Sequence, residues 1–197
     1  MEVKYPDRDD YPDFGPVLEE AQSLLNTLGQ AIVDKNSASV ADLDSFCDWY
    51  LVSELTNIWE PNHPKSCYVY YREGTFYAGP VWDFDWGTFL LNSNSLRIRN
   101  CMYYKDLFKD PAFAARIRER WAILKPRFQT LGQFVDAQAD WIRASEAVNH
   151  ALWPLPADRD VNHDEQLSFQ DAVDRMKLSI EQRIVVLDRE FGSSGGQ

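Results

Sequence analysis

The sequence predicts an α+β protein that is mostly α-helical, with one small antiparallel β-hairpin. Apolar residues recur at helical spacing over five segments, whereas only residues 68–72 and 76–83 have the composition of strands. The 197 residues are 45% hydrophobic and 14% aromatic, which is typical of a folded chain with a sizeable core. We therefore expect one domain over residues 1–192, followed by a Gly- and Ser-rich linker over 193–197.

The helices are delimited by caps and prolines. Pro16 and Pro111 each suit a first helical turn, and Asp110 and Ser168 are N-cap residues. Gly192 ends the last helix. The predicted helices span residues 16–35, 42–59, 110–126, 130–152 and 168–191.

The second helix, over 42–59, is apolar nearly all round, which predicts that it is buried at the centre of the fold. Glu54 lies on the same face as Cys47 and Tyr50, where an unpaired carboxylate would be costly. Two interpretations are open. Glu54 either makes a structural hydrogen bond to backbone or to an arginine, or it supports a metal site.

The stretch 77–89 carries Asp83 and Asp85 inside an aromatic run. Residues two apart on an extended chain share a face, which places the two carboxylates roughly 7 Å apart at the backbone. Trp82, Phe84 and Trp86 then share the other face. Two crowded carboxylates suit Mg²⁺ or Mn²⁺, which would relieve their repulsion. The alternative is two surface aspartates without a ligand.

Glu60 begins a polar loop, residues 60–66, which contains two prolines and comes directly before the predicted hairpin. Because Asp83 follows the far end of that hairpin, we expect Glu60 to lie near it. His63 is interpreted as a loop residue. Arg97 and Arg99 belong to the polar loop 92–100 and are candidates for contacting phosphate, or are ordinary solvated arginines.

Three segments, DLDSFCDWYLVSELT (42–56), KSCYVY (65–70) and GPVWDFD (79–85), closely resemble the spore-coat protein H (CotH) kinase family. The resemblance implies an atypical, secreted kinase with a protein-kinase-like fold, which transfers the γ-phosphate of ATP to Ser or Thr of secreted or surface proteins. It assigns the metal on ATP to Asp83 and Asp85, and the role of catalytic base to Glu60. The family has an aspartate where Glu60 stands, and the extra methylene moves the carboxylate by about 1 Å.

The resemblance also implies that this chain is the helical C-terminal lobe, and that an N-terminal lobe is absent. The sequence has no Gly-x-Gly-x-x-Gly and no Gly-Lys-Ser/Thr to cradle phosphates. We therefore expect the 197 residues alone to bind metal weakly and ATP hardly at all. Residues 1–30 lack the features of a signal peptide, so the extracytoplasmic location is an expectation from the resemblance.

Composition excludes some classes of function. The formal net charge of −11 disfavours nucleic acid, and no apolar run reaches the length of a membrane span. Cys47, Cys67 and Cys101 lack metal-ligand spacing, and Cys47 and Cys67 are expected to be buried free thiols. The main alternative function is an inactive binding or scaffold module for a glycan or protein. A glycosidase using Asp83 with Glu60 would depend on the separation of the two carboxylates.

Overall fold

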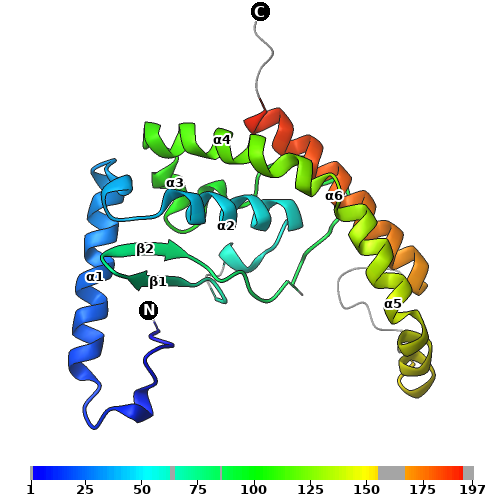
Figure 1. The fold of residues 1–197 in the computed structure, drawn as a ribbon, viewed down its shortest axis with the longest axis horizontal. Coiled ribbons are helices and arrows are strands. Elements are labelled where there is room, and N and C mark those ends of the chain that lie inside the picture. The colour runs from blue at the N-terminus through cyan, green and yellow to red at the C-terminus, as the bar shows by residue number, and fades with distance from the viewer. Residues whose placement is uncertain (1, 63–64, 85, 155–166, 193–197) are drawn as a thin grey trace, which may run out of the picture.

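The computed structural model describes residues 2–62, 65–84, 86–154 and 167–192. Within these ranges the chain forms six α-helices and one two-stranded sheet. Figure 1 shows how these elements are arranged. The helices are α1 (Gly15–Val33), α2 (Leu43–Thr56), α3 (Tyr104–Leu107), α4 (Pro111–Phe128), α5 (Leu131–Leu152) and α6 (Phe169–Phe191). The strands are β1 (Val69–Arg72) and β2 (Thr75–Ala78). The prediction of a mostly helical α+β fold is confirmed.

Helix α2 is the centre of the molecule. It begins at the N-cap Asp42, whose side chain accepts a hydrogen bond from the Ser45 amide at 2.8 Å. It ends where Asn57 takes a left-handed conformation, with φ at 60°, earlier than the predicted end at residue 59. Helices α4 and α6 pack against α2, and strand β2 packs on its opposite side (Figure 1).

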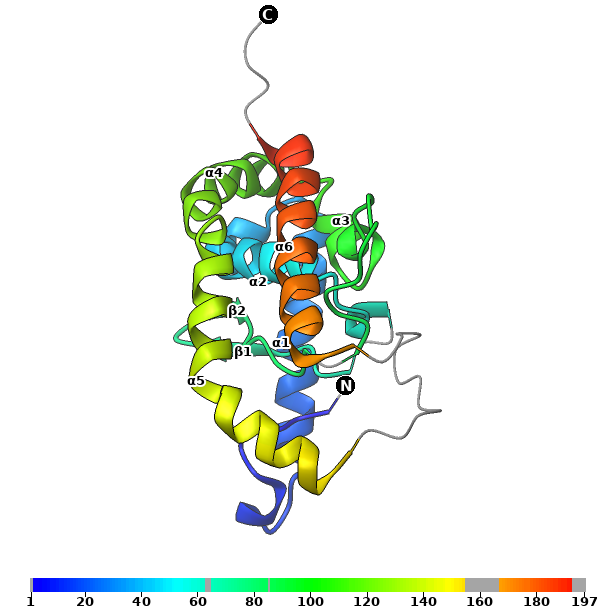
Figure 2. The ribbon, with the colours of Figure 1, turned by 90° about the vertical axis from the view of Figure 1, so that its right-hand side faces the viewer.

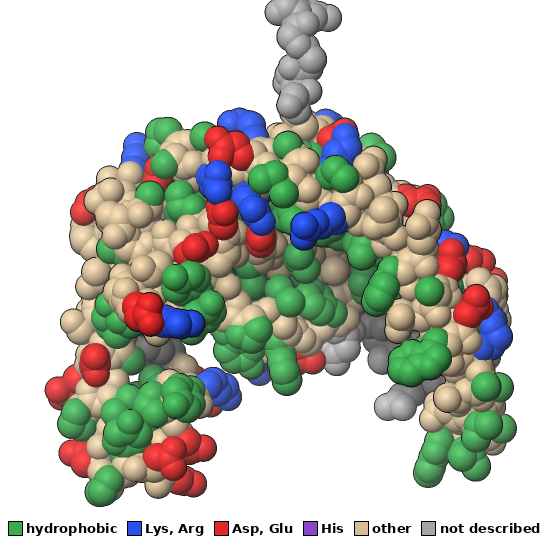
Figure 3. Space-filling model, viewed as in Figure 1, with side chains coloured by type: hydrophobic (Ala, Val, Ile, Leu, Met, Phe, Trp, Pro, Cys, Tyr) green, Lys and Arg blue, Asp and Glu red, His purple; other side chains and the backbone are tan. Residues whose placement is uncertain are grey.

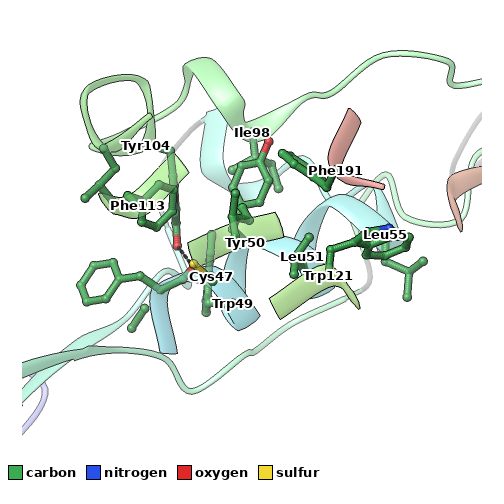
Figure 4. Close-up of a cluster of buried hydrophobic side chains, with 14 of the residues drawn as sticks. Cys47, Trp49, Tyr50, Leu51, Leu55, Ile98, Tyr104, Phe113, Trp121 and Phe191 are labelled. Atoms are coloured by element: carbon green, nitrogen blue, oxygen red, sulfur yellow. Dashed lines mark hydrogen bonds between the residues drawn. The ribbon is translucent and has the colours of Figure 1, made fainter. Parts of the chain in front are cut away.

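The core around α2 is rich in aromatic side chains. Figure 4 shows Tyr50 of α2 among residues from three other helices, namely Tyr104, Trp121 and Phe191. The hydroxyl of buried Tyr104 donates to the Phe46 carbonyl at 3.0 Å, so its polar group is satisfied. The expectation that α2 is buried nearly all round is confirmed, because both of its faces meet other elements.

The hairpin is shorter than predicted. Its register pairs Val69 with Ala78 and Arg72 with Thr75, and positive φ at both Glu73 and Gly74 makes a two-residue turn. The predicted extension of the second strand to residue 83 is wrong. Gly79, with φ at 119°, takes the backbone out of the strand, and the next residue is a proline that has no N–H to donate.

Two smaller differences concern the helices. Helix α4 runs past Pro126 to Phe128, so the predicted end at Pro126 is two residues early. The short helix α3 has no counterpart in the sequence prediction. Helix α1 extends away from the core on one side, and an arm formed by α5 and the N-terminal part of α6 extends away on the other (Figure 1). Figure 2 shows α5 beside α6 in this arm. No helix in the described ranges is long and apolar enough to cross a membrane.

Candidate functional site

Asp83 lies in the irregular segment that follows β2, and its side chain is exposed. Its backbone is left-handed, with φ at 64°, which is uncommon for a residue other than glycine. The Ser66 hydroxyl, on the loop that leads into β1, donates to Asp83 Oδ2 at 3.2 Å. The segment after β2 is therefore joined to the segment before β1. Asp85, the second predicted metal ligand, lies outside the described residues.

Glu60 occupies a 3₁₀ turn, Glu60–Asn62, directly after Trp59. Its half-buried side chain lines a small cavity that is also lined by Ser66. Val81, Trp82 and Phe84 line the same cavity, so Glu60 lies near the segment that carries Asp83. The cavity has a volume of about 10 Å³, so a nucleotide would have to lie outside it.

Trp59 connects the Glu60 turn to the acidic segment. Its amide donates to the Trp86 carbonyl at 3.3 Å, and the two indole rings are 6.3 Å apart. Gly87 permits this approach: a Cβ atom on Gly87 would lie 2.1 Å from Trp59 Cδ1. The sequence analysis missed the contact between Gly87 and Trp59. Trp59 belonged to a predicted helix end, and no pattern in the sequence pointed to the contact.

Arg97 packs against the ring of Trp59. Its guanidinium carbon is 4.4 Å from the Trp59 ring centroid, and its Nη1 donates to the Asn57 carbonyl at 2.8 Å. Burial lowers the pKa of Arg97 from its ordinary value, with the nearby charge of Arg183 acting in the same direction. Arg97 is thus held close to the Glu60 turn, and its contact with phosphate stays a prediction.

Arg99 points elsewhere. Its guanidinium lies over the Phe108 ring at 4.8 Å, and its Nη1 is 3.8 Å from Glu190 Oε2 near the end of α6. The structure therefore does not bring the two predicted phosphate-binding arginines together.

Glu54 is completely buried and fully engaged. It accepts hydrogen bonds from the Arg97 and Ile98 amides at 2.9 and 2.7 Å and from Arg183 Nη2 at 2.9 Å. Burial raises the pKa of the Glu54 carboxyl, while these donors and the charge of Arg183 act against that rise. The structural interpretation of Glu54 is confirmed, since both kinds of expected partner, backbone and arginine, contact it.

The same arginine fixes the loop 92–100. Arg183 Nη1 donates to the carbonyls of Ser93 and Ser95 at 2.9 and 2.8 Å, and Nε donates to the Glu54 carbonyl at 2.8 Å. Arg183 thereby joins the loop to both α2 and α6, and these contacts fix the position of Arg97 within the loop.

The donor set suits a hard cation only in part. In the portion of the chain that the structure describes, no three His, Cys, Asp or Glu residues cluster closely enough to hold a metal. Asp83 and Ser66 offer oxygen atoms, which Mg²⁺ prefers, and Mg²⁺ is usually held by one or two carboxylates together with substrate phosphates. The described residues fit a metal that arrives with a nucleotide, rather than one held in a protein cage.

Comparison with known proteins decides the family. A family model described as CotH kinase protein matches residues 2–187. The chain belongs to the CotH kinase family. No curated protein and no solved structure matches the chain.

The cysteines of this CotH family chain are free thiols. Cys47 is buried in the core, and half-buried Cys67 lines the cavity beside Glu60. Burial, together with the charge of Glu60, raises the pKa of Cys67 to about 11. A thiol with such a pKa stays protonated near neutral pH, so Cys67 is not an activated nucleophile.

Proposed function

We propose that this CotH family chain contributes the catalytic base and metal-binding residues for transfer of the ATP γ-phosphate to Ser or Thr of secreted or surface proteins. The family match supports a kinase-like function. The observation that carries the finer proposal is the arrangement around Ser66, which bonds to Asp83 and shares a cavity with Glu60. Half-buried Glu60 and exposed Asp83 are 23 positions apart in sequence, and their common neighbour Ser66 supports their joint use in phosphoryl transfer.

In this proposal Glu60 accepts the proton of the substrate hydroxyl. The hydroxyl oxygen then forms a bond to the γ-phosphorus as the bond to the bridging oxygen breaks, and ADP leaves with that oxygen. A bound Mg²⁺ or Mn²⁺ would neutralise developing charge on the phosphate oxygens. Asp83 would hold that ion, with Asp85 as a second ligand or as an acceptor that orients the loop.

The nucleotide phosphates also need a cationic partner. Of the two candidate arginines, Arg97 is the one beside the Glu60 turn, where it contacts Trp59 and the Asn57 carbonyl. We therefore include in the proposal a lysine-bearing lobe outside residues 1–197. The expected extracytoplasmic location likewise belongs to the proposal.

The test is transfer of label from γ-labelled ATP in the presence of Mn²⁺ to a basic acceptor protein, using the natural polypeptide that contains residues 1–197. We expect phosphoserine or phosphothreonine in the acceptor. Label no greater than that of an Asp83→Ala control would contradict the proposal.

Exposed aromatic side chains beside the site favour a second candidate, a binding module on the same fold. Trp82 is 58% exposed, and Tyr70 stacks on Tyr77 with ring centroids 4.9 Å apart. Such flat, exposed rings can pack on sugars. Glycan-array binding that survives Asp83→Ala would support this candidate, whereas binding that disappears with Asp83→Ala would not.

A further inference from the structure

Helix α5 is covered on very little of its surface. It has 22 residues, of which only Ala139 is buried; its N-terminal part packs against α6, and its C-terminal part extends past α6 (Figure 2). Trp141 is 80% exposed, and Phe134 and Val148 are each 60% exposed. Single exposed apolar residues are common on proteins, whereas a contiguous exposed apolar patch marks an interaction surface.

These exposed residues have a regular spacing. Phe134, Trp141 and Val148 follow each other at intervals of seven residues, and exposed Leu152 comes four residues later. On a helix this spacing places them on one face. We call these four residues the α5 seam. Figure 3 shows hydrophobic side chains along this arm of the molecule.

A groove between α5 and α6 adjoins the seam. Its volume is about 320 Å³, and Phe134 belongs to both the groove and the seam. The other apolar residues that line the groove include Val135, Ile142, Phe169, Val173 and Met176. The seam and the groove therefore meet at Phe134.

The spacing indicates the shape of the occupant. A seven-residue repeat of apolar residues is the pattern with which a second helix packs knobs into holes. An apolar groove between two helices is likewise suited to the apolar face of an amphipathic helix. A peptide that binds by adding a strand would need a free strand edge, which two helices do not offer.

Charge indicates which residues should flank the apolar face of the bound helix. The cations beside the groove are already paired within the arm, Arg143 with Asp140 at 3.0 Å and Lys177 with Asp136 at 2.6 Å. Helix α5 carries three acidic residues against one arginine, and the whole chain has a net charge of −11. The ion pairs cancel much of the charge beside the groove, so it is the net negative charge of the whole chain that attracts a basic partner and repels anionic lipid.

We propose that the α5 seam and its groove bind an amphipathic helix of another protein, with apolar residues at seven-residue spacing flanked by lysine or arginine. This docking surface is separate from the site around Ser66, and the proposal does not depend on phosphoryl transfer.

The probe is a synthetic peptide of about three heptads, with leucine at the a and d positions and lysine at the flanking positions. A second peptide has glutamate at the flanking positions. Fluorescence anisotropy with the full chain should show at least about tenfold tighter binding of the lysine peptide, weakening as salt rises. Val148→Ser should reduce the affinity about tenfold, and Trp141→Ser at least as much.

Val185→Ser is the matched control, since Val185 on α6 is 69% exposed and does not line the groove. It should leave the affinity unchanged. All three substitutions are at exposed positions, so circular dichroism and thermal unfolding should stay close to those of the unaltered chain.

Three results would overturn the proposal. The first is a failure of specificity, seen either as equal affinity of the chain for the two peptides or as equal losses of affinity for the lysine peptide in Val148→Ser and Val185→Ser. The second is concentration-dependent self-association in sedimentation velocity that Trp141→Ser abolishes, which would assign the seam to a second copy of this chain. The third is seam-dependent binding to phosphatidylcholine–phosphatidylserine vesicles without binding to the lysine peptide.

Discussion

The guanidinium of Arg183 and the carboxylate of Glu54 form a completely buried ion pair, with Nη2 and Oε2 2.9 Å apart. The two residues are 129 positions apart in sequence, and they join α2 to α6. The pair also fixes the loop that carries Arg97, because Glu54 accepts the Arg97 amide and Arg183 donates to two carbonyls of that loop. The position of the candidate site therefore depends on an ion pair that itself does no chemistry.

Replacing Arg183 should destabilise the fold strongly. Arg183→Met leaves the Glu54 carboxylate buried without its cation, which typically costs about 3–5 kcal/mol in the free energy of unfolding. Urea unfolding measures this cost. The control is Arg189→Met on the same helix, where an exposed arginine donates to the Asn94 carbonyl and should contribute less than about 1 kcal/mol. Similar losses in the two variants would contradict the account.

Gly87 should not tolerate alanine. Gly74 and Gly87 both have positive φ, 85° and 66°, so alanine is strained at either position. Only at Gly87 would the added methyl meet Trp59, because nothing lies within 4 Å of a Cβ on Gly74. We expect Gly87→Ala to lower the free energy of unfolding by about 1–3 kcal/mol more than Gly74→Ala does. Equal effects on the urea midpoint would show that the contact with Trp59 is unimportant.

Ser66 should act as a positioning residue for Asp83 if the proposed function is right. Its hydroxyl orients the Asp83 carboxylate, and loss of such a partner typically lowers metal affinity or activity by about 10–100-fold. Ser66→Ala should raise the Mn²⁺ concentration needed for half-maximal label transfer by at least about tenfold. Ser39→Ala, an exposed serine that donates to the Asn36 carbonyl, is the control. An unchanged Mn²⁺ requirement in Ser66→Ala would remove Ser66 from the site.

Stability should fall in acid below about pH 4. The hydrogen bond from Arg116 lowers the pKa of Asp44, and the hydrogen bonds from Lys125 and then Trp121 lower that of Asp188. A depressed folded-state pKa gives stability that is complete above the unfolded value and lost as pH falls through the folded one. Urea midpoints between pH 7 and pH 2 measure this loss.

The Asp44→Asn variant should lose less stability between those pH values than the unaltered chain. The exposed Asp9→Asn variant is the control and should follow the unaltered chain. A pH dependence that is the same in Asp44→Asn and Asp9→Asn would contradict the role of the Arg116 contact.

The sequence was sufficient for the five long helices, because caps and apolar periodicity are local signals, but not for the single turn of α3. The N-caps Asp110 and Ser168 accept backbone hydrogen bonds as predicted. It was also sufficient to mark Glu54, since a carboxylate on an apolar face requires partners. That one partner would be Arg183, 129 residues away, could not be read from a local pattern.

The candidate site was less predictable because its geometry depends on backbone conformations and on distant contacts. Alternation of residues in a strand suggested a shared face for the two aspartates, but β2 ends at Ala78, and Asp83 has a left-handed backbone. The hydrogen bond from Ser66 crosses 17 residues of sequence, which include the whole hairpin. Proximity of Glu60 to the acidic segment was inferred from the order of loop and hairpin, and that order did indicate the right neighbourhood.

The most direct test of the central claim compares label transfer by two carboxylate variants with a matched control, in the natural polypeptide that contains residues 1–197. Asp83 and Glu73 are both exposed, both carry a carboxylate, and both have positive φ, 64° and 51°. We predict that Asp83→Asn and Glu60→Gln each lower the initial rate of Mn²⁺-dependent transfer from γ-labelled ATP by at least about 100-fold. Glu73→Gln should keep the unaltered rate. Transfer by Asp83→Asn at the rate of Glu73→Gln would contradict the assignment of Asp83 to the metal and, with it, the proposed function.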